Sequence, residues 1–264
     1  MLVLAILLLL LLLCVSMIGA SRPLPRQEEL YDNGANYGRV GVLNFATPEV
    51  WEYARFSVLL WQQYCDRHRY EFFFVPLSLD RTRHDVWSKV IACEQYLPRV
   101  DWLLFAEADT VPIDEPLSIE THLIKQFVEP DTLVLIGTNC GTERWCWDEG
   151  PNTSVYLMRN SPETMELLRY WYKSADVNQE CNIYLDRHPR EQLTFWHCVM
   201  KKYPKQVKLI NYKYLHGVDG VFAKHLLGFG FSKERKIEEF SKIFVERGLN
   251  KTTCDIHTYP CGGK

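Results

Sequence analysis

The sequence has no surplus of basic residues. Its 30 Lys and Arg against 33 Asp and Glu give a formal net charge of −3. Proteins that bind nucleic acids need a basic patch or stripe, so this balance argues against a nucleic-acid partner. A disordered or low-complexity chain is also excluded, because 47% of the residues are hydrophobic and 24% are charged. No internal repeat is visible, and 264 residues suit one large domain or two small ones.

The nine cysteines include no Cys-x-x-Cys motif, which argues against a zinc ribbon or a thioredoxin-type site. Apart from Cys14, which lies in an apolar N-terminal run, eight cysteines remain. An even number permits four disulfides in an oxidising compartment. The close pairs Cys140/Cys146 and Cys254/Cys261 are the simplest candidates. The alternative is that several of the eight are free buried thiols.

Charged residues are missing from the first 21 positions, and residues 2–15 are mostly leucine. Extended to residue 20, the run would be about 28 Å long as a helix, which nearly spans a bilayer core. Ile18-Gly-Ala20 is typical of a cleavage site, but the usual positive residues before the apolar run are missing. Residues 1–20 are therefore predicted to be a signal peptide or a type II signal anchor, with residues 2–20 in the membrane in the second case.

Both alternatives place the rest of the chain in the secretory pathway, in the Golgi or ER lumen, or outside the cell. The glycosylation sequons at Asn152 and Asn250 agree with this prediction. Residues 21–37 are polar and contain Pro23 and Pro25, which is typical of a stem or linker. Residues 38–264 are then expected to form one domain.

Strand-like and helix-like segments alternate along this domain. Thr47-Pro48 and Ser161-Pro162 are each typical of a helix start, with an N-cap before a proline. Strands are expected at residues 39–45, 71–75, 102–106, 132–137, 154–159 and 207–210. Helices are expected at residues 48–65, 85–97, 161–174 and 190–203. The alternation predicts an α/β fold with a mainly parallel central sheet.

Two carboxylates follow the most apolar of these strands. Glu107 and Asp109 stand two positions apart directly after Trp102-Leu-Leu-Phe-Ala106. Ligands of open α/β sheets bind beyond the carboxyl ends of the strands. Two carboxylates facing each other there repel, and a hard divalent cation such as Mg²⁺ or Mn²⁺ relieves that repulsion. The alternative is that both are solvated turn residues.

These residues also carry a resemblance. Residues 101–110, Asp-Trp-Leu-Leu-Phe-Ala-Glu-Ala-Asp-Thr, resemble the strand and Asp-x-Asp segment of nucleotide-sugar glycosyltransferases of the GT-A fold. The order of motifs is most similar to glycosyltransferase family 34, the galactosyl-, mannosyl- and xylosyltransferase group. The other similar segments are Trp87-Ser-Lys89, Asn152-Thr-Ser-Val-Tyr-Leu-Met-Arg-Asn160, a helix ending in Trp171, Arg190-Glu-Gln-Leu-Thr194 and His225-Leu-Leu-Gly228.

The resemblance covers residues 38–235 and has three departures. Glu107 stands in place of the first Asp of the motif, Ser154 in place of a Gly, and Glu191 in place of an Asp. The departures put the identity of the sugar donor in doubt more than the fold.

The resemblance implies a metal site and a donor site. By this resemblance, Asp109 would be the main ligand of Mn²⁺ (or Mg²⁺), Glu107 would assist, and His225 would be the third ligand. His216 is the alternative to His225. The residues implied to act on substrates are Lys89 and Lys233 on the diphosphate, Gln192 and Glu191 as catalytic residues near the transferred sugar, and Asn152 and Asp148 as substrate-binding residues. For each of these, an ordinary structural or surface role is the alternative.

The function implied is metal-dependent transfer of a hexose or pentose from a UDP- or GDP-sugar to a hydroxyl of a glycan or other acceptor, with retention of configuration. A catalytically inactive GT-A domain that serves as a sugar-binding or scaffold protein is the second hypothesis, motivated by Glu107. A nucleotidyltransferase is disfavoured, because Asn44-Phe-Ala-Thr-Pro48 after the first strand is not a glycine-rich phosphate loop.

Overall fold

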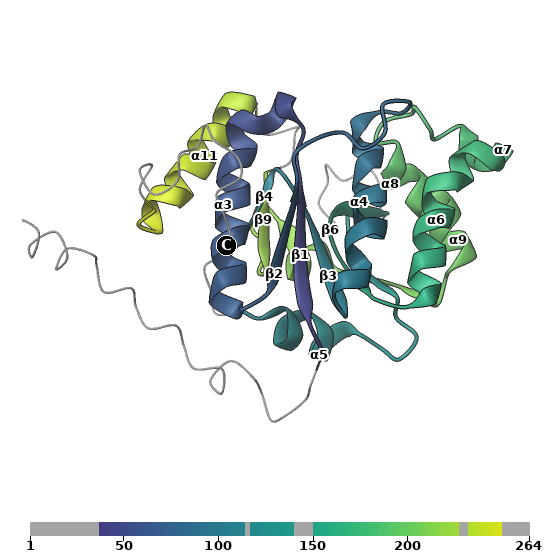
Figure 1. Ribbon diagram of the computed structural model, residues 1–264, viewed down its shortest axis with the longest axis horizontal. Helices are drawn as coiled ribbons and strands as arrows, with labels where there is room; N and C mark the ends of the chain where they lie inside the picture. The colour runs from purple at the N-terminus through teal and green to yellow at the C-terminus, as the bar shows by residue number, and fades with distance from the viewer. Residues whose placement is uncertain (1–36, 114–116, 140–149, 227–231, 250–264) are drawn as a thin grey trace, which may run out of the picture. The chain divides into compact units, whose positions relative to one another are not determined.

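Six strands form the central sheet, in the order β2-β1-β3-β6-β5-β7 (Figure 1). The computed structural model describes residues 37–113, 117–139, 150–226 and 232–249, all within one unit of residues 34–264. The strands are β1 (Val40–Phe45), β2 (Glu71–Val75), β3 (Trp102–Glu107), β5 (Val134–Thr138), β6 (Pro151–Arg159) and β7 (Val207–Ile210). All neighbours pair in parallel except β6, which is antiparallel to β3 and β5. The mixed α/β class with a mostly parallel sheet is confirmed.

Alternate residues of each strand pack on opposite faces of this sheet. In β1, Leu43 and Phe45 join one core cluster, whereas Val40 and Val42 join another. The first cluster packs against α4 (Ser88–Tyr96) and α6 (Pro162–Val177), and the second packs against α3 (Trp51–His68). Apolar strands covered on both faces are typical of buried parallel sheets, and Figure 1 shows the helices on both sides.

A second, smaller sheet follows β3 in the chain. It contains β4 (Thr110–Pro112), β9 (Ala223–His225) and β8 (His216–Gly217), in the order β4-β9-β8. The last described helix, α11 (Lys233–Glu246), packs Phe240 and Phe244 into a third core cluster with residues of α3. These contacts hold α11 beside α3, as Figure 1 shows. The remaining helical elements are α5 (Lys125–Phe127), α7 (Gln179–Asn182), α8 (Glu191–Thr194), α9 (Met200–Lys202), α10 (Tyr212–Leu215), 3₁₀ turns at Pro48–Val50, Asp85–Trp87 and Leu97–Arg99, and π-helical turns at Glu120–Ile124 and Phe195–Val199.

The helix starts agree with the sequence in one case and differ in the other. Ser161 caps α6, since its hydroxyl accepts a hydrogen bond from the backbone N–H of Thr164 at 3.1 Å. Thr47 precedes a 3₁₀ turn rather than an α-helix, and its side chain makes no capping hydrogen bond. The helix expected at residues 190–203 is built from α8, the π-helical turn Phe195–Val199 and α9.

Four of the cysteines lie in the described residues, as one disulfide and two free thiols. Cys181 and Cys198 form a disulfide, which the sequence did not single out, and Cys65 and Cys93 are free buried thiols. The pairs Cys140/Cys146 and Cys254/Cys261 lie outside the described residues, as does the apolar N-terminal run. Within the described ranges, no helix has the length and apolar character needed to cross a membrane.

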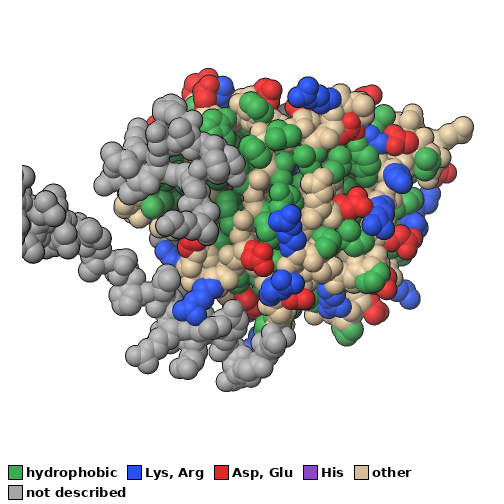
Figure 2. All heavy atoms as spheres, viewed as in Figure 1, with side chains coloured by type: hydrophobic (Ala, Val, Ile, Leu, Met, Phe, Trp, Pro, Cys, Tyr) green, Lys and Arg blue, Asp and Glu red, His purple; other side chains and the backbone are tan. Residues whose placement is uncertain are grey.

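Charges of both signs are interspersed over one face of the molecule. Figure 2 shows blue and red side chains distributed among hydrophobic ones on that face, without a large single-sign patch among the described residues there. This distribution agrees with the nearly balanced composition.

Candidate functional site

The pairing of β4 with β9 brings the predicted metal ligands together. Glu107 ends β3, and Asp109 lies in the two-residue turn before β4. In the small sheet, Thr110 pairs with His225, so the imidazole lies beside the turn. The backbone N–H of Leu226 also donates to the carbonyl of Asp109 at 3.0 Å. Glu107, Asp109 and His225 each offer a ligand atom within 4.8 Å of the others.

Asp109 is held between two nitrogen atoms. One carboxylate oxygen lies 3.4 Å from Nε2 of His225, and the other accepts a hydrogen bond from Nζ of Lys236 at 2.7 Å. Burial by itself would raise the pKa of Asp109, but His225 and Lys236 outweigh it and hold the pKa below its ordinary value. Asp109 is therefore a carboxylate at neutral pH, which is the form that binds cations.

Lys89 is a buried cation between two carboxylates. Its side chain projects from the first turn of α4, is 2% exposed, and forms ion pairs with Glu107 and with Glu191, the latter at 2.9 Å. Desolvation would lower the pKa of Lys89, but the two carboxylates raise it above the ordinary value. The sequence predicted a phosphate contact for Lys89. That contact stays a prediction. Without a ligand, the buried ammonium group has its anionic partners within the protein.

Glu191 and Gln192 begin α8 on the other side of Lys89. Burial raises the pKa of Glu191, and Lys89 opposes this effect. One oxygen of Glu191 is paired with Lys89, and the other is buried without a hydrogen-bond partner among the described residues. Oε1 of Gln192 accepts a hydrogen bond from the backbone N–H of Thr153 at 3.2 Å. Both side chains therefore face the start of β6, which lies near the turn of Asp109 because β6 pairs with β3.

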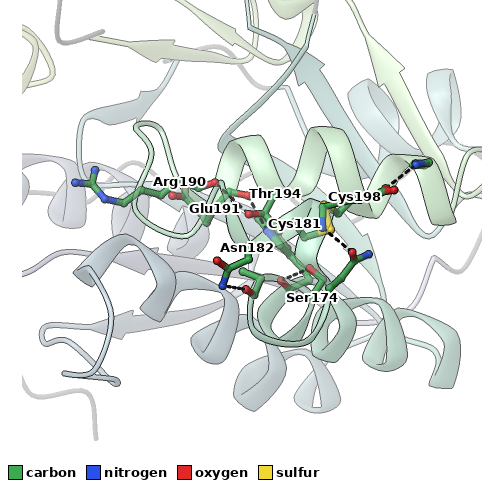
Figure 3. Close-up of a disulfide and its surroundings, with 12 residues drawn as sticks. Ser174, Cys181, Asn182, Arg190, Glu191, Thr194 and Cys198 are labelled. Carbon is green, nitrogen blue, oxygen red and sulfur yellow. Dashed lines mark hydrogen bonds and ion pairs between the residues drawn. A yellow bond between two sulfur atoms is a disulfide. The ribbon is translucent and has the colours of Figure 1, made fainter.

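The backbone before Glu191 is fixed from several directions (Figure 3). Arg190 has a positive φ of 53°, and its carbonyl accepts a hydrogen bond from the hydroxyl of Thr194 at 3.3 Å. The indole N–H of Trp171 donates to the carbonyl of Glu191 at 2.8 Å. The Cys181–Cys198 disulfide links α7 to the π-helical turn that follows α8. These contacts hold the Glu191–Gln192 pair in place.

Asn152 is engaged within the protein. Its side-chain carbonyl accepts from the backbone N–H of Ser154 at 2.9 Å, and its amide donates to Asn139 at 3.1 Å. With 3% exposure, the side chain has no room for a glycan. Of the two other predicted substrate contacts, Lys233 pairs with Glu52 at 2.9 Å on the surface, and Asp148 lies outside the described residues.

Two residues of this site were missed by the sequence reasoning. Lys236 lies three positions after Lys233, and residues three apart share a helix face. That spacing was the available signal for Lys236. Thr153 lies next to the predicted Asn152, and its hydroxyl donates to Glu191 at 3.1 Å.

The residues fit a hard divalent cation. Three carboxylates (Glu107, Asp109, Glu191) and two ammonium groups (Lys89, Lys236) leave one net negative charge. Oxygen ligands with one imidazole suit Mg²⁺ and Mn²⁺. Within the described ranges, Nδ1 of the buried His225 and both ring nitrogens of His216 have no hydrogen-bond partner. The two ring centroids are 5.6 Å apart. Burial lowers the pKa of His216, and the imidazole nitrogens of histidine are common metal ligands.

Comparison with solved structures identifies the architecture. A glycosyltransferase involved in the glycosylation of the major capsid of PBCV-1 aligns with a TM-score of 0.62 and 18% sequence identity, over 77% of this chain and 99% of that one. The chain has the GT-A fold. Two more distant structures are the galactosyltransferase LgtC (TM-score 0.47, 11% identity, 76% of this chain and 95% of that one) and mouse xyloside xylosyltransferase 1 (TM-score 0.41, 12% identity, 66% and 86%).

No protein-family model and no curated protein sequence matches the chain. The expected GT-A fold is thus confirmed by structure, whereas the particular likeness to family 34 stays a prediction.

Proposed function

We propose that this protein is a metal-dependent glycosyltransferase that moves a hexose or pentose from a UDP- or GDP-sugar to a hydroxyl of a glycan or other acceptor. The observation that carries the proposal is the group of Glu107, Asp109 and His225 at the carboxyl end of β3, within 4.8 Å of one another in a GT-A fold. Carboxyl ends of strands are where open α/β sheets bind ligands.

Each side chain of the site has a role in this proposal. Asp109, Glu107 and His225 hold Mn²⁺ or Mg²⁺, which when bound neutralises the charge developing on the diphosphate leaving group. Glu191 and Gln192 orient hydroxyls of the transferred sugar, and the unpartnered oxygen of Glu191 is the acceptor available for one of them. Lys89 pairs with both Glu107 and Glu191 and so links the metal ligand Glu107 to the sugar-orienting Glu191.

Transfer with retention fits this set of residues. The acceptor oxygen bonds to the anomeric carbon while the bond from that carbon to the phosphate oxygen breaks. The departing phosphate takes the proton of the acceptor hydroxyl, so no dedicated general base is required. Catalysis then rests on positioning and on charge stabilisation in a largely buried site.

A second function has an observation in its favour. Glu107 and Asp109 already have lysine partners, Lys89 and Lys236, within the protein. A GT-A domain in which these pairs persist would bind sugars or serve as a scaffold without catalysing transfer.

Screening purified protein against UDP- and GDP-sugars with Mn²⁺ distinguishes the two functions. The enzyme proposal expects release of UDP or GDP from at least one donor, and loss of that release when EDTA is added. If no donor is consumed, and Mn²⁺ with UDP or GDP gives no thermal shift, the enzyme proposal is wrong. A thermal shift with a sugar alone, without turnover, would favour the binding protein.

We also propose that the protein acts in the lumen of the Golgi or ER, with residues 2–20 as its signal or anchor. The uncharged N-terminal run and the Cys181–Cys198 disulfide support this compartment, because disulfides persist in oxidising environments.

A further inference from the structure

Lys236 is bonded to a carboxylate that a metal ion would need as a ligand. Its side chain is 9% exposed, and its ammonium group donates to Asp109 at 2.7 Å. The nitrogen also lies 5.1 Å from the centre of the Tyr53 ring, so an aromatic face borders the ammonium group as well. The residue lies one turn into α11, which Phe240 and Phe244 anchor in the core. Lys236 therefore enters the site from a fixed helix.

A divalent cation and this ammonium group compete for the same carboxylate. A metal ion needs the oxygen atoms of Asp109 as ligands, and one of the two is bonded to Lys236 in the structure. Two cations held a few ångströms apart in a poorly solvated site repel strongly. Glu107, the other acidic ligand, is paired with Lys89 and compensates little.

We propose that Lys236 is an internal competitor for the metal: it occupies Asp109 in the metal-free protein and leaves it when a divalent cation binds. This inference rests on the proposed function. It adds to that function a residue, Lys236, that lowers the affinity of the site for the metal. The released ammonium group then needs an anionic partner, and a nucleoside diphosphate brings one to the same place. The metal and the nucleotide are thereby expected to bind better together than either does alone.

Mn²⁺ titration of the full-length protein without nucleotide tests the competition. Isothermal titration or the Mn²⁺ EPR signal gives the dissociation constant directly. Lys236→Met removes the ammonium group and keeps most of the side-chain length, and we expect it to bind Mn²⁺ about ten-fold more tightly than the wild type. The matched control is Lys242→Met, which removes an exposed lysine of the same helix that pairs with Glu246. It is expected to leave the Mn²⁺ affinity within about two-fold, because exposed charges are screened.

A second measurement uses the wild-type protein and does not depend on a variant that folds. An amine-acylating reagent with mass-spectrometric readout reports how fast each lysine reacts. Saturating Mn²⁺ should increase the reaction rate of Lys236 and leave that of Lys242 unchanged. Equal Mn²⁺ affinity of Lys236→Met and wild type, or an unchanged rate at Lys236 while Mn²⁺ is bound, would overturn the inference and leave the proposed function standing. If neither protein binds Mn²⁺, the metal site itself is wrong and the inference with it.

Discussion

Lys89 is a buried cation on which the stability of the site depends. It is fully buried, and its two partners are carboxylates assigned to opposite ends of the site. Removing one partner of a buried ion pair leaves an uncompensated charge and is strongly destabilising. We expect Lys89→Met to lower the free energy of unfolding by about 3–5 kcal/mol, measured by urea denaturation at neutral pH.

An exposed ion pair provides the comparison for Lys89. Lys201 pairs with Glu180 at 3.0 Å, and both side chains are largely exposed. Surface ion pairs contribute little, so Lys201→Met is expected to leave the free energy of unfolding nearly unchanged. Equal losses for the two variants would show that Lys89 is not the buried counter-charge described above.

Asp109 predicts a dependence on pH in the metal-free protein. Its pKa is lowered in the folded state, mainly by His225 and Lys236 acting against desolvation. A carboxyl group with a lowered folded pKa stabilises the protein above its unfolded pKa, and this contribution is lost as the pH falls through the folded pKa. The difference in unfolding free energy between wild type and Asp109→Asn should therefore be constant near neutral pH and shrink below about pH 4. A difference that grows in acid would contradict the charge state assigned to Asp109.

For single residues, the sequence indicated which candidate ligands come together, but not the lysines that pair with them. Glu107 and Asp109 stand out because they follow a long apolar strand, and His225 was inferred from the order of motifs. Lys236 lies 127 positions from Asp109, and nothing local to either residue indicates the contact. The burial of Lys89 and its two carboxylate partners also arise only from tertiary packing, so the sequence did not indicate them.

Among the elements, the segment from α7 to the π-helical turn contains Glu191 and Gln192, which are proposed to orient the sugar. The Cys181–Cys198 disulfide closes it with a sequence separation of 17 residues. A cross-link over a loop of that length is worth about 3 kcal/mol in the chain-entropy model. The Cys181→Ser/Cys198→Ser double variant is expected to lose about that much stability in urea denaturation.

Reductant supplies the control for the disulfide. Adding a phosphine reductant should destabilise the wild type more than the double variant, in which only the other cysteine pairs remain to be reduced. Full resistance of the wild type, when mass spectrometry confirms reduced thiols, would mean that the bridge does not support this segment.

The elements themselves were predictable where local signals are strong. The apolar runs that became β1, β2 and β3 and the Ser161-Pro162 start of α6 follow from the sequence. The reversed direction of β6 and its earlier start at Pro151 do not, because strand pairing is a long-range property. That earlier start is what brings Asn152 and Thr153 to the edge of the site.

At the scale of the whole molecule, the proposed compartment has a direct test. Deleting residues 2–20 should retain the protein in the cytosol and leave Cys181 and Cys198 reduced, because the cytosol keeps thiols reduced. Fractionation followed by thiol labelling of the full-length and deleted chains measures both effects. Delivery of the deleted chain to the secretory pathway would contradict the role assigned to the apolar run.

The fold brings three potential ligands together at the carboxyl end of β3. The central claim is that they hold a catalytic divalent cation. The most direct test measures Mn²⁺-dependent release of UDP or GDP from the best donor of the screen. It compares wild type, Asp109→Ala and the control Asp131→Ala. Asp131 is exposed and lies before the start of β5, at the opposite end of the sheet. We predict turnover by wild type and Asp131→Ala, and none by Asp109→Ala at any Mn²⁺ concentration. Undiminished turnover by Asp109→Ala would contradict the claim.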